Sequence, residues 1–76
     1  MQYEVARRVG AQLAYWRGQA GLSQAELGRR TGYRASVVCS IERGRATAWP
    51  KFRRAVAAAL DVPEAVIFGP PGDPRD

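Results

Sequence analysis

The apolar residues of this 76-residue chain recur at helical spacing along most of its length. In the first segment they are separated by four, four, three and four residues, which places them on one stripe of a helix. The stripe consists of Val5, Val9, Leu13, Trp16 and Ala20. This pattern predicts a helix from about Tyr3 to Ala20, and Gly21 is a residue suited to end it.

A second helix begins with a cap that the sequence makes visible. Ser23 is followed three residues later by Glu26, which is the pattern of a capping box. In that arrangement the serine hydroxyl accepts a hydrogen bond from the N–H of Glu26, and the glutamate accepts one in return from the N–H of Ser23. The pattern predicts a short helix over Gln24–Thr31, which Gly32 ends.

Three more helices are predicted downstream. The third covers residues 35–43, where Val38 and Ile41 face inward although the neighbouring residues have low helix propensity. The fourth covers residues 50–60 and starts on a proline, and the short fifth helix covers residues 63–68. Because no strand-like alternation is present, the expected fold is all-α, a compact bundle of five short helices.

A chain of this length is expected to form one domain, over residues 1–69. Residues 70–76 read PPGDPRD and have few groups that could pack on a core, so they are expected to form a disordered tail.

The amino-acid composition excludes most kinds of catalytic chemistry. The chain has no His and a single Cys, Cys39, so His-based catalysis, an internal disulfide and the usual metal sites are excluded. No enzymatic activity, cofactor, metal or small-molecule ligand is therefore expected. No apolar run approaches the ~18 residues of a membrane span, and no signal peptide is visible. We expect a cytoplasmic protein with no membrane attachment, in which Cys39 is an inert small side chain.

Positive charge is concentrated in the middle of the chain. Residues 29–54 hold eight basic residues and one acid, Glu42, whereas residues 61–76 carry a net −3. A basic segment of this kind indicates either a surface that binds a polyanion or a solvated, arginine-rich surface.

The second and third predicted helices, joined by a turn with Gly32, form the pattern of a helix-turn-helix. Three segments extend the likeness: GLSQAEL at residues 21–27, SIERG at residues 40–44, and ALDV at residues 59–62 after Pro50. Together they resemble the phage-repressor-like (Cro/repressor, or XRE-type) helix-turn-helix family. The resemblance covers roughly residues 5–69 and implies a five-helix domain that binds operator DNA, commonly as a two-fold dimer.

The resemblance also implies phosphate contacts at two places. The first is the start of the second helix, where free N–H groups favour an anion. Ser23 is expected to cap this helix, and two alternatives are open: it caps the helix alone, or it also contacts a phosphate. Gln24 is expected to point outward with no local partner and to contact phosphate. The second place is the end of the third helix and the loop beyond it, which implies phosphate contacts by Arg43, Arg45 and Lys51. Arg53 and Arg54 are expected to lie on a solvated face.

Base contacts are implied for the beginning of the third helix. The residues there are Arg34, Ala35, Ser36 and Ser40. Ala and Ser discriminate poorly between bases, so specificity is expected to depend on Arg34, which can donate two hydrogen bonds to guanine. Contact with a phosphate, or with neither group, remains open for Arg34.

Two structural roles follow from the same resemblance. Arg17 and Glu42 match an internal ion pair between the first and third helices of some relatives. Dimerisation is expected through the fifth helix, by Val66, Ile67 or Phe68. Tyr33 is expected to be half buried, and Trp49 is expected to pack either on a dimer partner or on a DNA sugar.

The sequence therefore predicts a sequence-specific transcriptional regulator whose partners are double-stranded DNA and a second copy of the chain. The alternative is an adaptor or antitoxin-like module with the same fold and weak DNA reading. The small side chains at the start of the third helix favour the alternative, and the basic segment opposes it.

Overall fold

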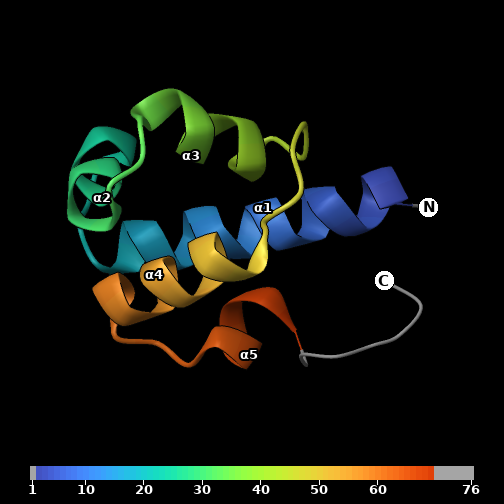
Figure 1. Ribbon diagram of the computed structural model, residues 1–76. Coiled ribbons are helices and arrows are strands. Elements are labelled where there is room, and N and C mark those ends of the chain that lie inside the picture. Colours follow the sequence, from blue (N-terminus) through green and yellow to red (C-terminus); the bar gives the residue numbers. More distant parts are fainter. Residues whose placement is uncertain (1, 70–76) are drawn as a thin grey trace.

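The computed structural model describes residues 2–69, and within that range the chain forms five helices and no strand. The helices are α1 (Gln2–Gln19), α2 (Gln24–Thr31), α3 (Ala35–Glu42), α4 (Pro50–Leu60) and α5 (Glu64–Phe68) (Figure 1). The expectation of an all-α, five-helix fold is confirmed. The tail predicted for residues 70–76 lies outside the described residues.

The long helix α1 runs through the middle of the molecule (Figure 1). α3 packs on both α1 and α2, and α5 packs on α1 and α4. In Figure 1, α2 and α3 lie on one side of α1 and α5 lies on the other. The helix-turn-helix is thus supported from behind by α1 and α4.

A single core holds the five helices together. Its fully buried side chains come from every helix, from a single large apolar residue in α2 to apolar residues at three- or four-residue spacing in α3 and α4. The largest of them are Leu13, Leu27, Val38, Ile41, Phe52, Val56 and Ile67. α3 has no side-chain hydrogen bond at its N-cap and poor helix propensity, so its stability comes from burying Val38 and Ile41.

The ends of α2 form largely as the sequence predicts. The Ser23 hydroxyl accepts the N–H of Glu26 at 3.0 Å, and Gly32 ends the helix in the left-handed conformation with φ of 84°. The second hydrogen bond predicted for the capping box, from the N–H of Ser23 to the Glu26 carboxylate, is wrong. Among the described contacts, the Glu26 carboxylate instead accepts hydrogen bonds from Arg29 and Arg30, which lie three and four residues along the same helix.

The backbone of α1 comes very close to the end of α3. A Cβ added to the buried Gly10 would lie 2.3 Å from the backbone oxygen of Glu42. On the other side of the contact, Gly44 has φ of 75°, and a Cβ there would lie 2.7 Å from Cγ of Arg7. The absence of a side chain at both positions lets α1 fix the end of α3 and the loop that follows.

Candidate nucleic-acid interface

The corner between α2 and α3 is tight because of a glycine that the sequence pattern did not single out. Gly28 is buried in α2, and a Cβ there would lie 2.3 Å from the backbone oxygen of Tyr33 in the turn. The backbone oxygen of Gly28 also accepts hydrogen bonds from the N–H groups of Gly32 and Tyr33. This packing brings the turn against α2 and sets the angle at which α3 leaves it.

The first turn of α3 is accessible from outside. Arg34, the N-cap residue, and Ser36 are exposed, while Ala35 and Ser40 are partly buried. No side-chain cap engages Arg34 among the described residues, so its guanidinium is not committed to holding the helix start. An exposed first turn is what a recognition helix needs in order to reach base edges.

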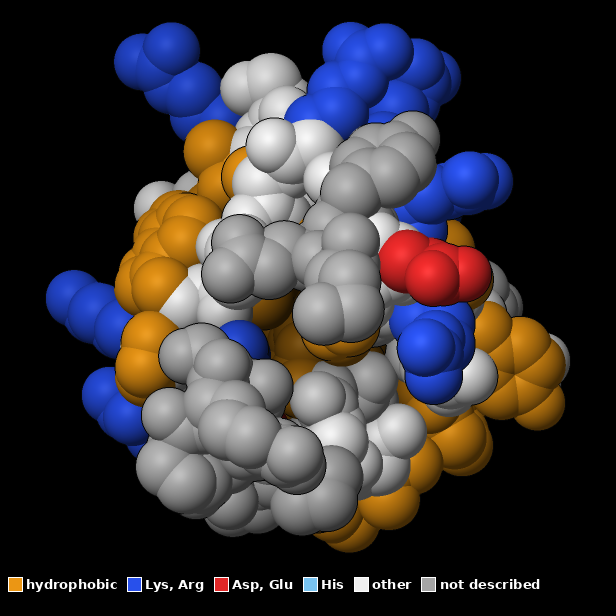
Figure 2. All heavy atoms as spheres, turned by 90° about the vertical axis from the view of Figure 1, so that its right-hand side faces the viewer, with side chains coloured by type: hydrophobic (Ala, Val, Ile, Leu, Met, Phe, Trp, Pro, Cys, Tyr) orange, Lys and Arg blue, Asp and Glu red, His pale blue; other side chains and the backbone are white. Residues whose placement is uncertain are grey.

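Exposed basic side chains lie at the other end of α3 and beyond it. Arg43, at the C-cap of α3, Arg45, in the following loop, and Lys51, in the first turn of α4, are all exposed. In Figure 2 several Lys and Arg side chains lie at the top of the molecule, the side on which α3 and the segment after it lie in Figure 1, and others lie lower on its left and right sides. The basic rim, defined here as Arg43, Arg45 and Lys51, offers positive charge to phosphate groups, and the exposed Ser23 marks the N-terminus of α2, which favours the same anions.

The structure contains the ion pair expected between Arg17 of α1 and Glu42 of α3. Nε of Arg17 donates to Oε2 of Glu42 at 2.5 Å, and Nη2 donates to Oε1 at 3.0 Å. The third nitrogen, Nη1, donates to the backbone oxygen of Leu22 at 2.8 Å. The Glu42 side chain is only 6% exposed, and its hydrogen bond raises the pKa of Arg17. The pair therefore ties α1, α3 and the start of α2 together.

The Gln24 side chain has a hydrogen-bond partner within the protein, which corrects the expectation that it points outward without one. Its Nε2 donates to Oε1 of Glu42 at 2.9 Å, and its side chain is partly buried. An amide nitrogen carries two protons, so one N–H remains for another acceptor. Sequence reasoning missed this contact because the two residues are 18 positions apart and meet only when α2 packs on α3.

The packing also corrects the expectation for Arg53 and shows what surrounds Trp49, whose predicted contact with a dimer partner or a DNA sugar stays a prediction. Arg53 does not lie on a solvated face: its Nε donates to the backbone oxygen of Ala48 at 2.7 Å, and its guanidinium lies 5.9 Å from the ring centroid of Phe68. Trp49 packs edge-on against Tyr33, with ring centroids 5.3 Å apart. Tyr33 is half buried, as predicted, and Trp49 keeps 39% of its surface exposed beside the turn.

Two of the residues predicted for a dimer contact belong to the core of the chain itself. Ile67 and Phe68 are 1% and 8% exposed, because the inner face of α5 packs on α1 and α4. They have almost no surface to offer a partner, which corrects that part of the prediction. Val66 is 48% exposed and lies with Val5, which is 52% exposed, along a shallow groove between α1 and α5.

Within residues 2–69, no group of three or more His, Cys, Asp or Glu side chains is placed to hold a metal ion. None of the five described helices has the length and apolar character to cross a membrane.

The chain matches the model of the helix-turn-helix domain family over residues 8–67, which is most of its length and includes all of α2, α3 and α4. It therefore belongs to this family of XRE/Cro-like helix-turn-helix domains. The family is one of DNA-binding domains and is typically non-enzymatic. No curated protein matches the chain in sequence.

Proposed function

We propose that the chain is a sequence-specific DNA-binding regulator of transcription that inserts the beginning of α3 into the major groove. The observation that carries the proposal is the exposed first turn of α3, together with the exposed basic residues at the far end of that helix, in the loop beyond it and on α4. A helix-turn-helix docks with its second helix in the major groove and its first helix across the backbone. The family match supports the same orientation.

Sequence reading is assigned to the first turn of α3. Arg34 is exposed and makes no cap contact among the described residues, so it can donate two hydrogen bonds to O6 and N7 of a guanine. Ala35 and Ser36 add short contacts, the first to a thymine methyl group, and Ser40 lies one turn further along the helix. Specificity in this proposal therefore depends most on Arg34.

Phosphate contacts set the register of the domain on the duplex. Arg43, Arg45 and Lys51 contribute charge around the far end of α3, and Ser23 presents the N-terminus of α2. Gln24 contributes the amide proton that its bond to Glu42 leaves over. These contacts bind every sequence alike, so they supply affinity without discrimination.

We further propose that the regulator acts as a homodimer on an inverted repeat. Val5 and Val66 support this step, since they expose about half of their surface along one groove between α1 and α5. A two-fold dimer places the same patch of each copy at the contact. One recognition helix reads only a few base pairs, so a second copy increases specificity.

The base-reading role of Arg34 is tested by comparing Arg34→Ala with Arg45→Ala on a panel of DNA duplexes. Arg34→Ala is expected to relax the preference at one base pair and to cost about 1–3 kcal/mol on the preferred sequence. Arg45→Ala is expected to weaken the affinity for all DNA sequences by the same factor. A uniform loss with Arg34→Ala would refute base reading by this residue.

The alternative function is an adaptor or antitoxin-like module that keeps the fold and reads DNA weakly. It is favoured by the small side chains of Ala35, Ser36 and Ser40, which offer few specific hydrogen bonds to bases. The two functions differ in the salt dependence of DNA binding. Neutralising ~5 phosphates per protomer predicts a log–log slope of about −4 to −5 for the regulator, and an adaptor without a DNA site would lack it.

A further inference from the structure

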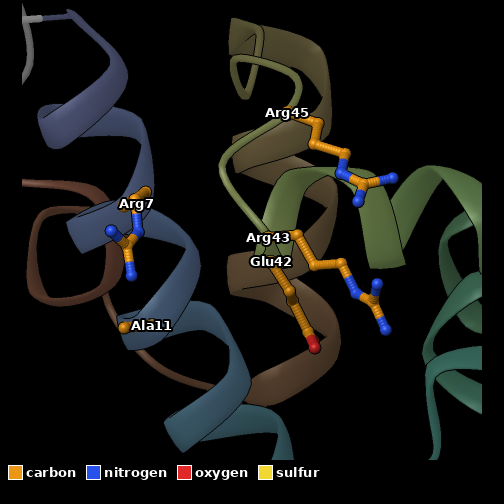
Figure 3. A pocket seen from close by; sticks show the side chains of 5 residues that line it. All are labelled: Arg7, Ala11, Glu42, Arg43 and Arg45. Atoms are coloured by element: carbon orange, nitrogen blue, oxygen red, sulfur yellow. The ribbon is translucent and has the colours of Figure 1, made fainter.

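A hollow lies between the N-terminal half of α1 and the segment that follows α3. Figure 3 shows its lining: Arg7 and Ala11 come from α1, and Glu42, Arg43 and Arg45 come from the end of α3 and the loop beyond it. Three guanidinium groups from two separate parts of the chain therefore border one depression in the surface. Two of them, Arg43 and Arg45, already belong to the rim assigned to phosphates.

The acidic residue of this lining has its charge balanced within the protein. Both carboxylate oxygens of Glu42 accept hydrogen bonds from Arg17, and Oε1 also accepts one from Gln24. The other charged residues that line the hollow are all arginines. Like charges brought together on a surface attract an anion, and a planar guanidinium matches the geometry of a phosphate.

The position of Arg7 relative to the loop is fixed by backbone packing. Because Gly44 has no side chain, its Cα lies close to Arg7: a Cβ there would lie 2.7 Å from Cγ and 3.0 Å from Cα of Arg7. Ala11, one helical turn further along α1, is small and leaves the hollow open. A ligand bound by the loop therefore lies close to α1 as well.

We propose that Arg7 extends the DNA contact of this domain onto α1, by binding a backbone phosphate next to those held by Arg43 and Arg45. In Figure 3 the ends of Arg43 and Arg45 point away from Arg7, so the three groups do not meet at one point. Separated groups of this kind fit successive phosphates of a DNA strand better than one small phosphorylated molecule. The inference rests on the proposed DNA-binding function.

Sequence reasoning had no reason to select Arg7. It lies in the part of the chain whose charges nearly cancel, residues 1–28, with three arginines and two glutamates. Its relation to the basic segment arises only because Gly10 and Gly44 let α1 approach the end of α3.

The test measures DNA affinity by fluorescence anisotropy from 50 to 200 mM salt for wild type, Arg7→Gln, Arg54→Gln and Arg43→Gln. Glutamine keeps the Cβ and Cγ atoms that pack over Gly44 and removes the charge. Arg54→Gln is the control, because it removes the same charge from an exposed residue of α4 that lines neither the hollow nor the groove between α1 and α5. Melting curves of each variant verify that the domain remains folded.

Arg7→Gln is expected to make the log–log salt slope shallower by about 0.9 per protomer, which corresponds to about 3.5-fold less affinity lost over this salt range. The loss should be the same factor on every DNA sequence, and Arg54→Gln should keep the wild-type slope. If Arg7→Gln and Arg54→Gln give equal slopes while Arg43→Gln is shallower, the inference is overturned and the proposed function stands. If Arg43→Gln also keeps the wild-type slope, the proposed DNA surface itself is wrong.

A second arm separates DNA from a small anion by titrating pyrophosphate into the protein without DNA and monitoring backbone amide NMR signals. The proposal expects weak shifts that saturate only at millimolar pyrophosphate. Tight pyrophosphate binding that Arg7→Gln abolishes, together with an unchanged DNA salt slope, would assign the hollow to a small ligand and overturn the proposal.

Discussion

At the residue scale, Glu42 connects the structural and the binding roles of this domain. Its carboxylate holds Arg17 of α1 on one side and the amide of Gln24, at the start of α2, on the other. The same carboxylate borders the hollow that Arg43 and Arg45 share. A single acidic residue in a basic segment is accounted for by this set of contacts, since without Arg17 it would repel the phosphates that the segment is proposed to bind.

Replacing Glu42 by glutamine should destabilise the fold, because it leaves a mostly buried guanidinium without its charge partner. We expect a loss of about 2–3 kcal/mol, somewhat below the ~3–5 kcal/mol of a fully buried pair since Arg17 remains 20% exposed. For a domain of this size that loss lowers Tm by about 8–24 °C in thermal denaturation.

The matched control for this prediction is Glu26→Gln. Glu26 lies in the first turn of α2, and the hydrogen bonds from Arg29 and then Arg30 lower the pKa of Glu26. Its ion pairs are exposed, so the amide should change Tm little. Equal melting temperatures for Glu42→Gln and wild type would show that the buried pair does not hold the helices together.

At the scale of elements, the helices were predictable and their contacts were not. α2 and α4 have the predicted bounds, and α3 ends one residue early, because caps, glycines and a proline mark those ends locally. The bond of Gln24 to Glu42 and the burial of Ile67 depend on how separate helices pack. For the same reason Arg34 could be selected from the sequence as a candidate for base reading, because it lies within a local motif. The nearness of Arg7 to Arg43 could not be predicted, because it depends on the packing of α1 against the end of α3.

The contact between α1 and α3 gives a prediction of its own. Gly10→Ala should strongly destabilise the domain, because its Cβ would lie 2.3 Å from a backbone oxygen that cannot move without displacing the end of α3. Gly18→Ala in the same helix is the control, since a Cβ there meets nothing within 4 Å and alanine favours the helix by up to about 1 kcal/mol. Chemical denaturation should therefore place the two variants on opposite sides of wild type, and a neutral Gly10→Ala would contradict the packing described.

At the scale of the whole molecule, DNA binding and dimerisation are assigned to two different surfaces. The first turn of α3 and its basic rim are assigned to DNA, and the groove with Val5 and Val66 is assigned to a second copy. The core separates these surfaces, so changes in the groove should leave the fold and the reading helix intact. Dimerisation should then strengthen DNA binding by joining two half-sites.

Val66→Asp should weaken the dimer, because it introduces a charge into an apolar contact. We expect at least about a tenfold increase in the dimer dissociation constant, measured by sedimentation velocity, with little change in Tm since Val66 is 48% exposed. Ala58→Asp, at an exposed position of α4, is the control for an added charge. Identical association of Val66→Asp and wild type would remove the groove from the dimer contact.

The most direct test of the central claim, that α3 reads DNA sequence in the major groove, is the selection of binding sites from a random duplex pool near physiological salt. We expect an enriched inverted repeat whose half-sites lie about 10–10.5 base pairs apart, or a multiple of that spacing, from centre to centre. Arg34→Ala should lose the preference at one position of each half-site. If no sequence is enriched, α3 does not read bases, and the domain acts through salt-dependent coating of DNA or through a protein partner.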